Sequence, residues 1–140
     1  MLCAEYPLGL TTADGTRVIR EVLRLRDGGE LQVAGDVVAG QSVTLMTASK
    51  PDLLNAAEQA ALEAMAALKG APPRAALVFN CVGRLKIFGS QASAEIERIA
   101  RVIGPSTPLL GFYTYGELAP QAPCRPCHVH NKTVVVVLLA

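Results

Sequence analysis

Short runs in which apolar and polar residues alternate dominate the first third of the chain, and this pattern predicts β-strands. Residues 17–26 are rich in Val, Ile and Leu. The charged residues of this run share one strand face at period two, and they are Arg20, Arg24 and Arg26. The sequence Asp27-Gly28-Gly29 favours a hairpin turn, because these residues accept a positive φ. We therefore expect a return strand at residues 30–34 and a further strand at residues 42–47.

The spacing of apolar residues then changes to a helical period. Ser49 suits the N-cap of a helix, since its side chain can accept a hydrogen bond from the backbone of Asp52, and Pro51 suits the first turn. The stripe at helical spacing is mostly alanine and comprises Leu53, Ala57, Ala61, Ala64 and Leu68. Small side chains let such a helix lie close to a sheet, and Gly70 ends it.

Three apolar runs in the rest of the chain predict buried strands, at residues 74–80, 108–117 and 131–139. A second helix is expected near residues 96–103, and a loop with Cys81, Gly83 and Arg84 follows the first run. Strands and helices do not alternate regularly, which argues against a doubly wound fold. We predict one α+β domain over all 140 residues, with a mixed, mostly antiparallel sheet and two helices packed on it.

The predicted strands end in polar segments, where sheet proteins often place ligand contacts. Gly111 and Gly116 interrupt the second buried run, and a glycine in a strand marks a bulge or a close backbone approach. Arg84 can form a fork with a carboxylate, and Glu117 or Asn131 can hold an amine or an amide. The structural alternative is that Arg84 pairs with Glu117 and that Asn131 satisfies loop backbone.

Composition and charge exclude several classes of function. The net charge is +1 with no basic cluster, and aromatic residues are 4% with no Trp, so nucleic-acid binding is not expected. No apolar run of about 18 residues predicts a membrane span, and the N-terminus lacks a signal-peptide pattern. Four cysteines do not make a disulfide scaffold in a chain of this size, so we expect a cytoplasmic protein.

Four segments, in this order along the chain, carry a family resemblance, and they are Tyr6-Pro7-Leu8-Gly9, Phe79-Asn80-Cys81-Val82-Gly83-Arg84, Gly111-Phe112-Tyr113-Thr114-Tyr115-Gly116-Glu117 and His130-Asn131-Lys132-Thr133. Together they resemble the C-terminal half of the FIST sensory domain, over almost the whole chain. The sequence departs from that pattern at Asn80, where serine is expected, and at Lys132, where glutamine is expected.

The resemblance implies a small-molecule-binding sensory module of a signal-transduction system, not an enzyme, with an amino acid or another small carboxylate as the candidate ligand. We expect the N-terminal FIST half to be absent from this chain and its docking surface to be apolar. The expected partners are that half, a signalling domain or a second copy. No cofactor, catalytic residue or metal ligand is assigned. The predicted ligand-binding residues are Cys81, Arg84, Phe112, Thr114, Glu117, His130 and Asn131.

A cysteine and histidine cluster offers an alternative function. Cys124-Arg125-Pro126-Cys127-His128 has the pattern of c-type haem attachment. With His130, the same residues also have part of the spacing of a zinc site. Adjacent Cys127 and His128 do not easily face one ion, however, and the chain has no second ligand pair a dozen or more residues away.

Cys81 suggests a third hypothesis, a thiol enzyme. A nucleophilic cysteine needs a depressed pKa, and Arg84 three residues later can help to supply it. No cysteine and histidine motif of familiar spacing accompanies it, so a small buried side chain at a strand end is the favoured interpretation.

Overall fold

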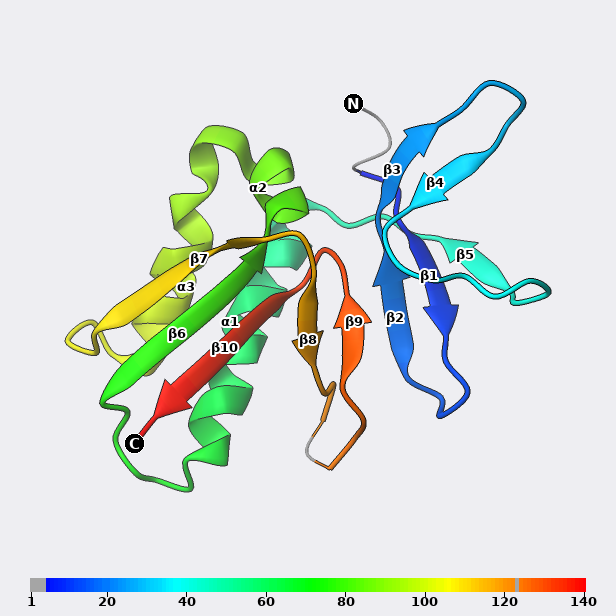
Figure 1. Cartoon of the computed structure of the whole chain (residues 1–140). Helices are drawn as coiled ribbons and strands as arrows, with labels where there is room; N and C mark the ends of the chain where they lie inside the picture. Colours follow the sequence, from blue (N-terminus) through cyan, green and yellow to red (C-terminus); the bar gives the residue numbers. More distant parts are fainter. Residues whose placement is uncertain (1–4, 123) are drawn as a thin grey trace.

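The computed structural model of the protein describes residues 5–122 and 124–140, and its elements form two parts side by side (Figure 1). Small sheets of N-terminal strands make up the first part, a helix-backed sheet makes up the second, and a hairpin lies between them (Figure 1). The α+β class and the mostly antiparallel strand pairing predicted from the sequence are confirmed. Among the residues described, none of the helices combines the length and the apolar character that a membrane crossing requires.

Two antiparallel sheets form the first part. Its strands are β1 Leu8–Thr11, β2 Arg17–Arg20, β3 Val22–Leu25, β4 Leu31–Val33 and β5 Val43–Leu45. One sheet has the order β2-β1-β5, and the other is the β3–β4 hairpin. The turn predicted at residues 27–29 is confirmed, because Gly28 and Gly29 connect the hairpin strands with φ values of 91° and 87°.

The single strand expected at residues 17–26 is wrong, because the chain breaks at Glu21 between β2 and β3. There the backbone N–H of Glu21 donates to Oδ1 of Asn131 at 3.3 Å. The break also separates the three arginines that were assigned to one face. Arg20 is buried and donates to backbone carbonyl groups, whereas the other two are exposed.

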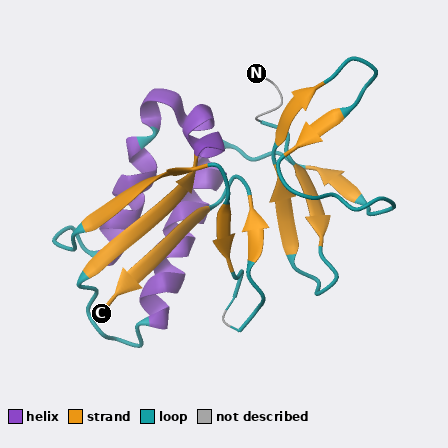
Figure 2. Ribbon diagram, in the orientation of Figure 1, coloured by secondary structure: helices purple, strands orange, loops and turns teal. Residues whose placement is uncertain are grey.

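The second part is built on a three-stranded sheet with the order β10-β6-β7. Its strands are β6 Ala75–Cys81, β7 Leu109–Thr114 and β10 Val134–Leu139, and its helices are α1 Lys50–Ala67 and α3 Ser93–Ile103. Central β6 runs antiparallel to β10 and parallel to β7. Figure 2 shows both helices on one face of this sheet.

The core lies between this sheet and the two helices. Its buried residues are Ala57, Ala61, Ala76, Val78, Ile99 and Ile103. The predicted capping of α1 is confirmed, since the Asp52 N–H donates to Ser49 Oγ at 3.3 Å and the Ser49 N–H donates to the Asp52 carboxylate at 2.9 Å. The buried alanines keep α1 close to the strands, as the stripe predicts.

A third helix, α2 Val82–Phe88, replaces the loop predicted after β6, and a short 3₁₀ segment, η2 Gly89–Gln91, follows it. Gly83 favoured a loop in the sequence, but its role is steric. A Cβ at this position would lie 2.5 Å from Nζ of Lys132, so a larger residue here would require the buried Lys132 side chain to shift. Tertiary packing therefore outweighs the low helix propensity of glycine.

The opposite face of the β10-β6-β7 sheet is not covered by a helix (Figure 2). We call it the open face, and it carries Leu77, Phe79, Leu110, Phe112, Val135 and Val137. β7 is an edge strand, so the burial expected for residues 108–117 is wrong: Leu110 and Phe112 are 70% and 62% exposed. An exposed apolar sheet face of this kind is typical of a contact surface.

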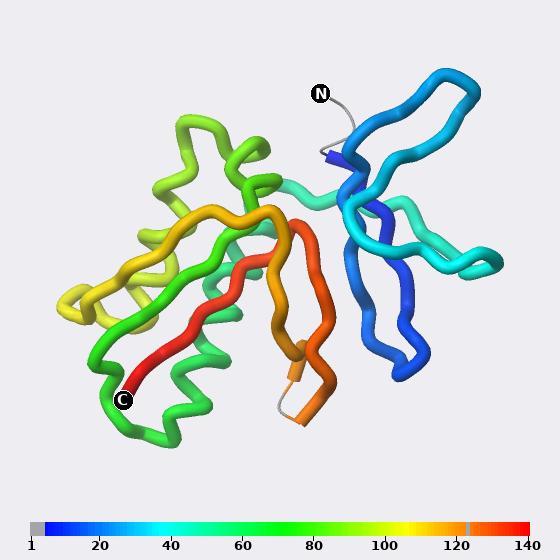
Figure 3. Tube along the Cα trace, viewed as in Figure 1, coloured from blue at the N-terminus to red at the C-terminus, as the bar shows by residue number. Residues whose placement is uncertain are grey.

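A hairpin of β8 Glu117–Ala119 and β9 His128–His130 joins the two parts. β9 lies beside β2, although more than 100 residues separate them in the sequence (Figure 3). β8 in turn contacts β6 and β10. The hairpin is therefore in contact with both parts of the molecule.

Candidate functional site

Several of the predicted site residues converge where β6 ends, because β7, β8 and β10 all meet this end of the strand. Cys81 is the last residue of β6, Thr114 is the last of β7, and Glu117 begins β8. Thr114 pairs with Cys81 across the parallel strands. The close backbone approach predicted at the two glycines is confirmed at Gly111, where a Cβ would lie 2.2 Å from the Val78 carbonyl oxygen. It is not found at Gly116, where a Cβ would have only ordinary contacts beyond 3.4 Å.

Glu117 is a buried carboxylate held by hydroxyl groups. The Thr114 hydroxyl donates to Oε1, and the Thr133 hydroxyl donates to Oε2 at 2.7 Å. Burial raises the pKa of Glu117 above its ordinary value, although these hydrogen bonds and one from the Cys81 thiol oppose the shift. Within the described part of the chain, none of the ion pairs includes Glu117.

A cavity of about 240 Å³ adjoins Glu117, and we call it the Glu117 cavity. Its lining residues are Phe79, Thr114, Gly116, Glu117, Leu118, Val135 and Val137. Phe79, Val135 and Val137 belong to the open face, and Leu118 belongs to β8. The cavity thus combines an apolar wall with one carboxylate and one hydroxyl group.

Arg84 does not reach this cavity. It is 2% exposed and pairs with Glu95 of α3, which is 0% exposed; Nε donates to Oε1 at 2.8 Å. Nη1 donates to the Lys132 carbonyl at 3.2 Å, and Nη2 donates to the Leu53 carbonyl at 2.8 Å. The structural alternative that pairs Arg84 with Glu117 is therefore wrong, because Arg84 uses its donors within the core.

Glu95, the buried partner of Arg84, is a structural residue that the sequence analysis did not identify. A signal for it existed: Glu95, Ile99 and Ile103 form the buried stripe of α3 at a spacing of four residues. A carboxylate in such a stripe requires a buried cation, because an unpaired charge there is costly.

Asn131 and Lys132 lie at the contact between the two parts of the molecule, and both interact with Glu21. Asn131 Oδ1 accepts from the Glu21 backbone, and Nδ2 donates to the Tyr115 carbonyl at 3.4 Å. Asn131 thus satisfies loop backbone, as its structural alternative states. Lys132 Nζ lies 3.0 Å from Oε1 of Glu21, and both side chains are buried. The cation of Lys132 is therefore neutralised inside the protein and does not line the Glu117 cavity.

Phe112 lies apart from the cluster around Glu117. Its ring packs edge-on against Phe79, with 5.3 Å between the ring centroids. Phe79 lines the Glu117 cavity, whereas Phe112 lines a different one, beside α3. The structure therefore places Phe112 in the wall of a different cavity from that of Thr114 and Glu117.

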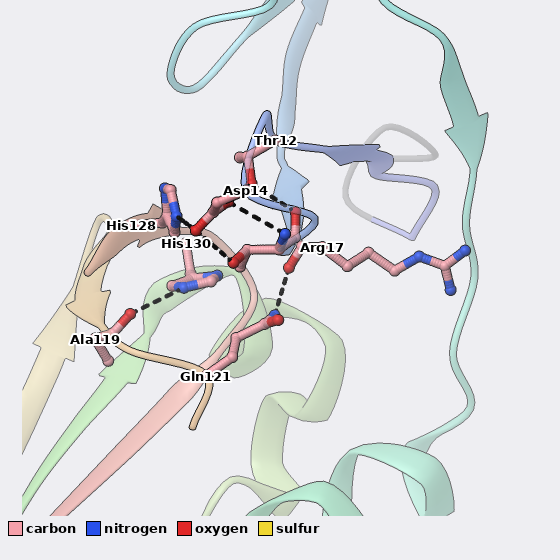
Figure 4. Close-up of polar contacts among 8 residues, drawn as sticks. Thr12, Asp14, Arg17, Ala119, Gln121, His128 and His130 are labelled. Atoms are coloured by element: carbon pink, nitrogen blue, oxygen red, sulfur yellow. Dashed lines mark hydrogen bonds and ion pairs between the residues drawn. The ribbon is translucent and has the colours of Figure 1, made fainter. Parts of the chain in front are cut away.

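The side chains of the two histidines of β9 form hydrogen bonds within the protein (Figure 4). His130 is buried, its Nε2–H donates to the Ala119 carbonyl at 3.1 Å, and burial lowers its pKa. His128 Nε2 lies 3.0 Å from Oδ2 of Asp14 in the β1–β2 turn. Hydrogen bonds from Thr12 and then His128 hold the pKa of Asp14 below its ordinary value.

Figure 4 also shows Gln121 donating to the Arg17 carbonyl, a further link between the β8–β9 hairpin and the N-terminal strands.

Cys124 and Cys127 are exposed free thiols. Within residues 5–122 and 124–140, no group of three or more His, Cys, Asp and Glu side chains is placed to hold a metal ion.

The Cys81 thiol is fully buried, and burial raises its pKa. A raised pKa keeps the thiol protonated, which disfavours the thiolate that a nucleophile or a metal ligand requires. Cys81 contacts Glu117 and so belongs to the surroundings of the carboxylate.

The structure is thus a small α+β domain that holds a buried carboxylate beside a cavity. Residues 1–120 match the family model described as FIST C domain. The chain therefore belongs to the FIST C domain family, whose members are sensory domains of signal-transduction proteins. The segment 130–133, which carried part of the resemblance, lies outside the matched residues. Comparison with curated proteins and with solved structures yields no match.

Proposed function

We propose that this sensory domain binds a small primary amine with an apolar body, such as an apolar amino acid, in the Glu117 cavity. The observation that supports the proposal is a buried carboxylate on a cavity wall, with no cation paired to it within the described residues. A buried negative charge is costly unless a positive charge compensates it. A ligand ammonium group would supply that compensation.

The arrangement favours recognition of the amine over recognition of a carboxylate. Arg84, the residue that sequence analysis assigned to a ligand carboxylate, is occupied by Glu95 and two backbone carbonyl groups. Phe79, Val135 and Val137 offer an apolar wall for the body of the ligand. A primary amine with an apolar body therefore satisfies the site through its ammonium group and its apolar part.

The proposed mechanism is a shift between two packings of the β8–β9 hairpin. Glu117 begins β8, and the hairpin is tied to the N-terminal turn through His128 and Asp14. A ligand that neutralises Glu117 would stabilise one of these packings. A partner, either a signalling domain or a second copy, would read the change at the open face, because the cavity adjoins that surface.

A calorimetric titration of apolar amino acids tests the amine assignment. The same compounds without the amino group are the ligand control. Glu117→Gln is expected to lose at least tenfold in affinity, about 1.4 kcal/mol, because the amide has no charge to pair with the ammonium. Glu97→Gln, an exposed carboxylate on α3, is the matched control and should bind as the wild type does.

The proposal fails if no primary amine binds, or if Glu117→Gln binds amines as tightly as the wild type. Sedimentation velocity with and without the bound amine tests the partner. A ligand-dependent change in self-association supports a second copy, and an unchanged monomer removes that choice.

A further inference from the structure

The loop between β8 and β9 carries two cysteines separated by two residues, Cys124 and Cys127. Both are exposed free thiols. The strands of the hairpin are paired as far as Ala119 and His128, so both thiols lie beyond the paired residues, in the loop at its tip (Figure 3). Solutes therefore reach both sulfur atoms without any opening of the fold.

The histidines next to this loop are held by other groups of the protein. The His128 ring lies 3.0 Å from the Asp14 carboxylate, and the His130 ring hydrogen-bonds to the Ala119 carbonyl. In both rings Nε2 makes the contact. The described residues also bring no third metal-binding side chain to the two thiols. The structure therefore leaves the thiols as a pair, and two thiols at this spacing are typical of a dithiol that closes to a disulfide.

The spacing allows a bond between the two sulfur atoms. A disulfide needs its Cα atoms about 4.4–6.8 Å apart, and the ends of a four-residue turn lie within about 7 Å. The loop is already bent at its start, because the Arg125 N–H donates to the Ala122 carbonyl at 3.2 Å and Cys124 has a φ of 64°. Pro126 disfavours a helical backbone at Arg125, so closing the bond must bend the segment between the thiols.

A bend at this point acts on the contact with the N-terminal strands. Cys127 directly precedes His128, the first residue of β9, whose ring contacts Asp14 in the β1–β2 turn. In the other limb of the loop, Gln121 donates to the Arg17 carbonyl. The segment that carries the thiols therefore lies between two side-chain links to the N-terminal strands, and a change in its shape alters them.

We propose that Cys124 and Cys127 form a reversible disulfide, a redox switch that alters the contact between the β8–β9 hairpin and the N-terminal strands. The oxidant is a low-molecular-weight disulfide such as glutathione disulfide. One cysteine thiolate attacks a sulfur of the oxidant, forms a mixed disulfide and expels a glutathione thiolate. The second cysteine thiolate attacks the protein sulfur of the mixed disulfide and expels the other glutathione.

The reaction balances as one S–S bond broken and one formed. The protein thiols lose two electrons and two protons, and glutathione disulfide takes them up and becomes two molecules of glutathione. A disulfide that closes a short loop constrains the unfolded chain less than one that closes a long loop, and an exposed disulfide is open to attack by thiols. The same glutathione couple therefore reverses the step when its reduced form is in excess.

The mass of one tryptic peptide tests the reaction. Trypsin does not cut before proline, so the bond after Arg125 survives, and peptide 102–132 contains Cys124 and Cys127 but no other cysteine. The full chain is equilibrated with reduced and oxidised glutathione in varied ratio, quenched with acid, alkylated and digested. As the share of glutathione disulfide rises, the peptide is expected to lose about 2 Da and to take up no alkylating reagent.

Cys81 is the internal control, because it is fully buried and should stay reduced under the same conditions. Glutathione adducts alone, a bond to any other cysteine or a second chain, or a peptide that stays reduced would overturn the proposed disulfide.

Amide chemical shifts test the switch separately from the bond. On oxidation, the 15N amide signals of Asp14 and His128 are expected to move in the wild type and to return when dithiothreitol is added. Cys124→Ser cannot close the bond and should show neither change, whereas Cys3→Ser keeps both loop thiols and should respond as the wild type does. Shifts confined to residues 120–127 would overturn the switch, even where the disulfide forms.

Discussion

Replacing Arg84 with methionine tests the buried ion pair that joins α2 to α3. Arg84 forms four hydrogen bonds, two of them to Glu95, and both side chains are at most 2% exposed. Arg84→Met leaves the Glu95 carboxylate buried, with the Asn80 amide as its remaining donor among the contacts described. Breaking a buried pair on one side costs about 3–5 kcal/mol, because the remaining charge stays out of water. We expect a loss of this size in the free energy of unfolding, measured by urea denaturation.

Helix α3, which carries Glu95, also provides a matched control. Arg98 pairs with Glu58 of α1, but these side chains are 35% and 37% exposed. Arg98→Met should therefore cost only about 0–1 kcal/mol. The double variant Arg84→Met/Glu95→Leu should recover more than half of the loss, since no uncompensated charge remains. If Arg84→Met is no more destabilising than Arg98→Met, the argument that Arg84 is a structural residue is refuted.

Two further predictions concern Glu117 and the glycines of the β7 region. Because burial raises the pKa of Glu117 above 4.5, the folded state holds this proton more tightly than the unfolded chain does. The wild type should therefore lose thermal stability relative to Glu117→Gln as pH rises above that value, and parallel melting curves would contradict this. Gly111→Ala should cost about 1–3 kcal/mol in urea denaturation, because its Cβ would meet the Val78 carbonyl. Gly116→Ala is the control, and equal losses in the two variants would disprove the steric argument.

Local signals in the sequence were sufficient for several elements. Ser49 and Asp52 form the cap of α1, and Gly28 and Gly29 form the hairpin turn, because these structures depend on residues close together in the chain. Gly83 shows where local reasoning fails. The segment was predicted as a loop, but the position lies in α2, where a Cβ would displace the buried Lys132 side chain.

The candidate site was predicted in part. The convergence of Cys81, Thr114 and Glu117 follows from strand ends that the sequence located, although neither their contacts nor the cavity beside them could be read from it. Glu95 was missed, since its partner lies 11 positions away on another helix and its carboxylate resembles that of any exposed first-turn residue.

The sequence alone determined the α+β class, the two longest helices, the hairpin turn and the FIST C resemblance, because capping, periodicity and short motifs act over a few residues. Only the tertiary structure decided which acid neutralises Arg84, which face of the β10-β6-β7 sheet stays open and which polar atoms border a cavity. Those outcomes depend on contacts between residues distant in the chain. A charge is inexpensive in water and costly in the core, so its role is determined by the neighbours that folding brings to it.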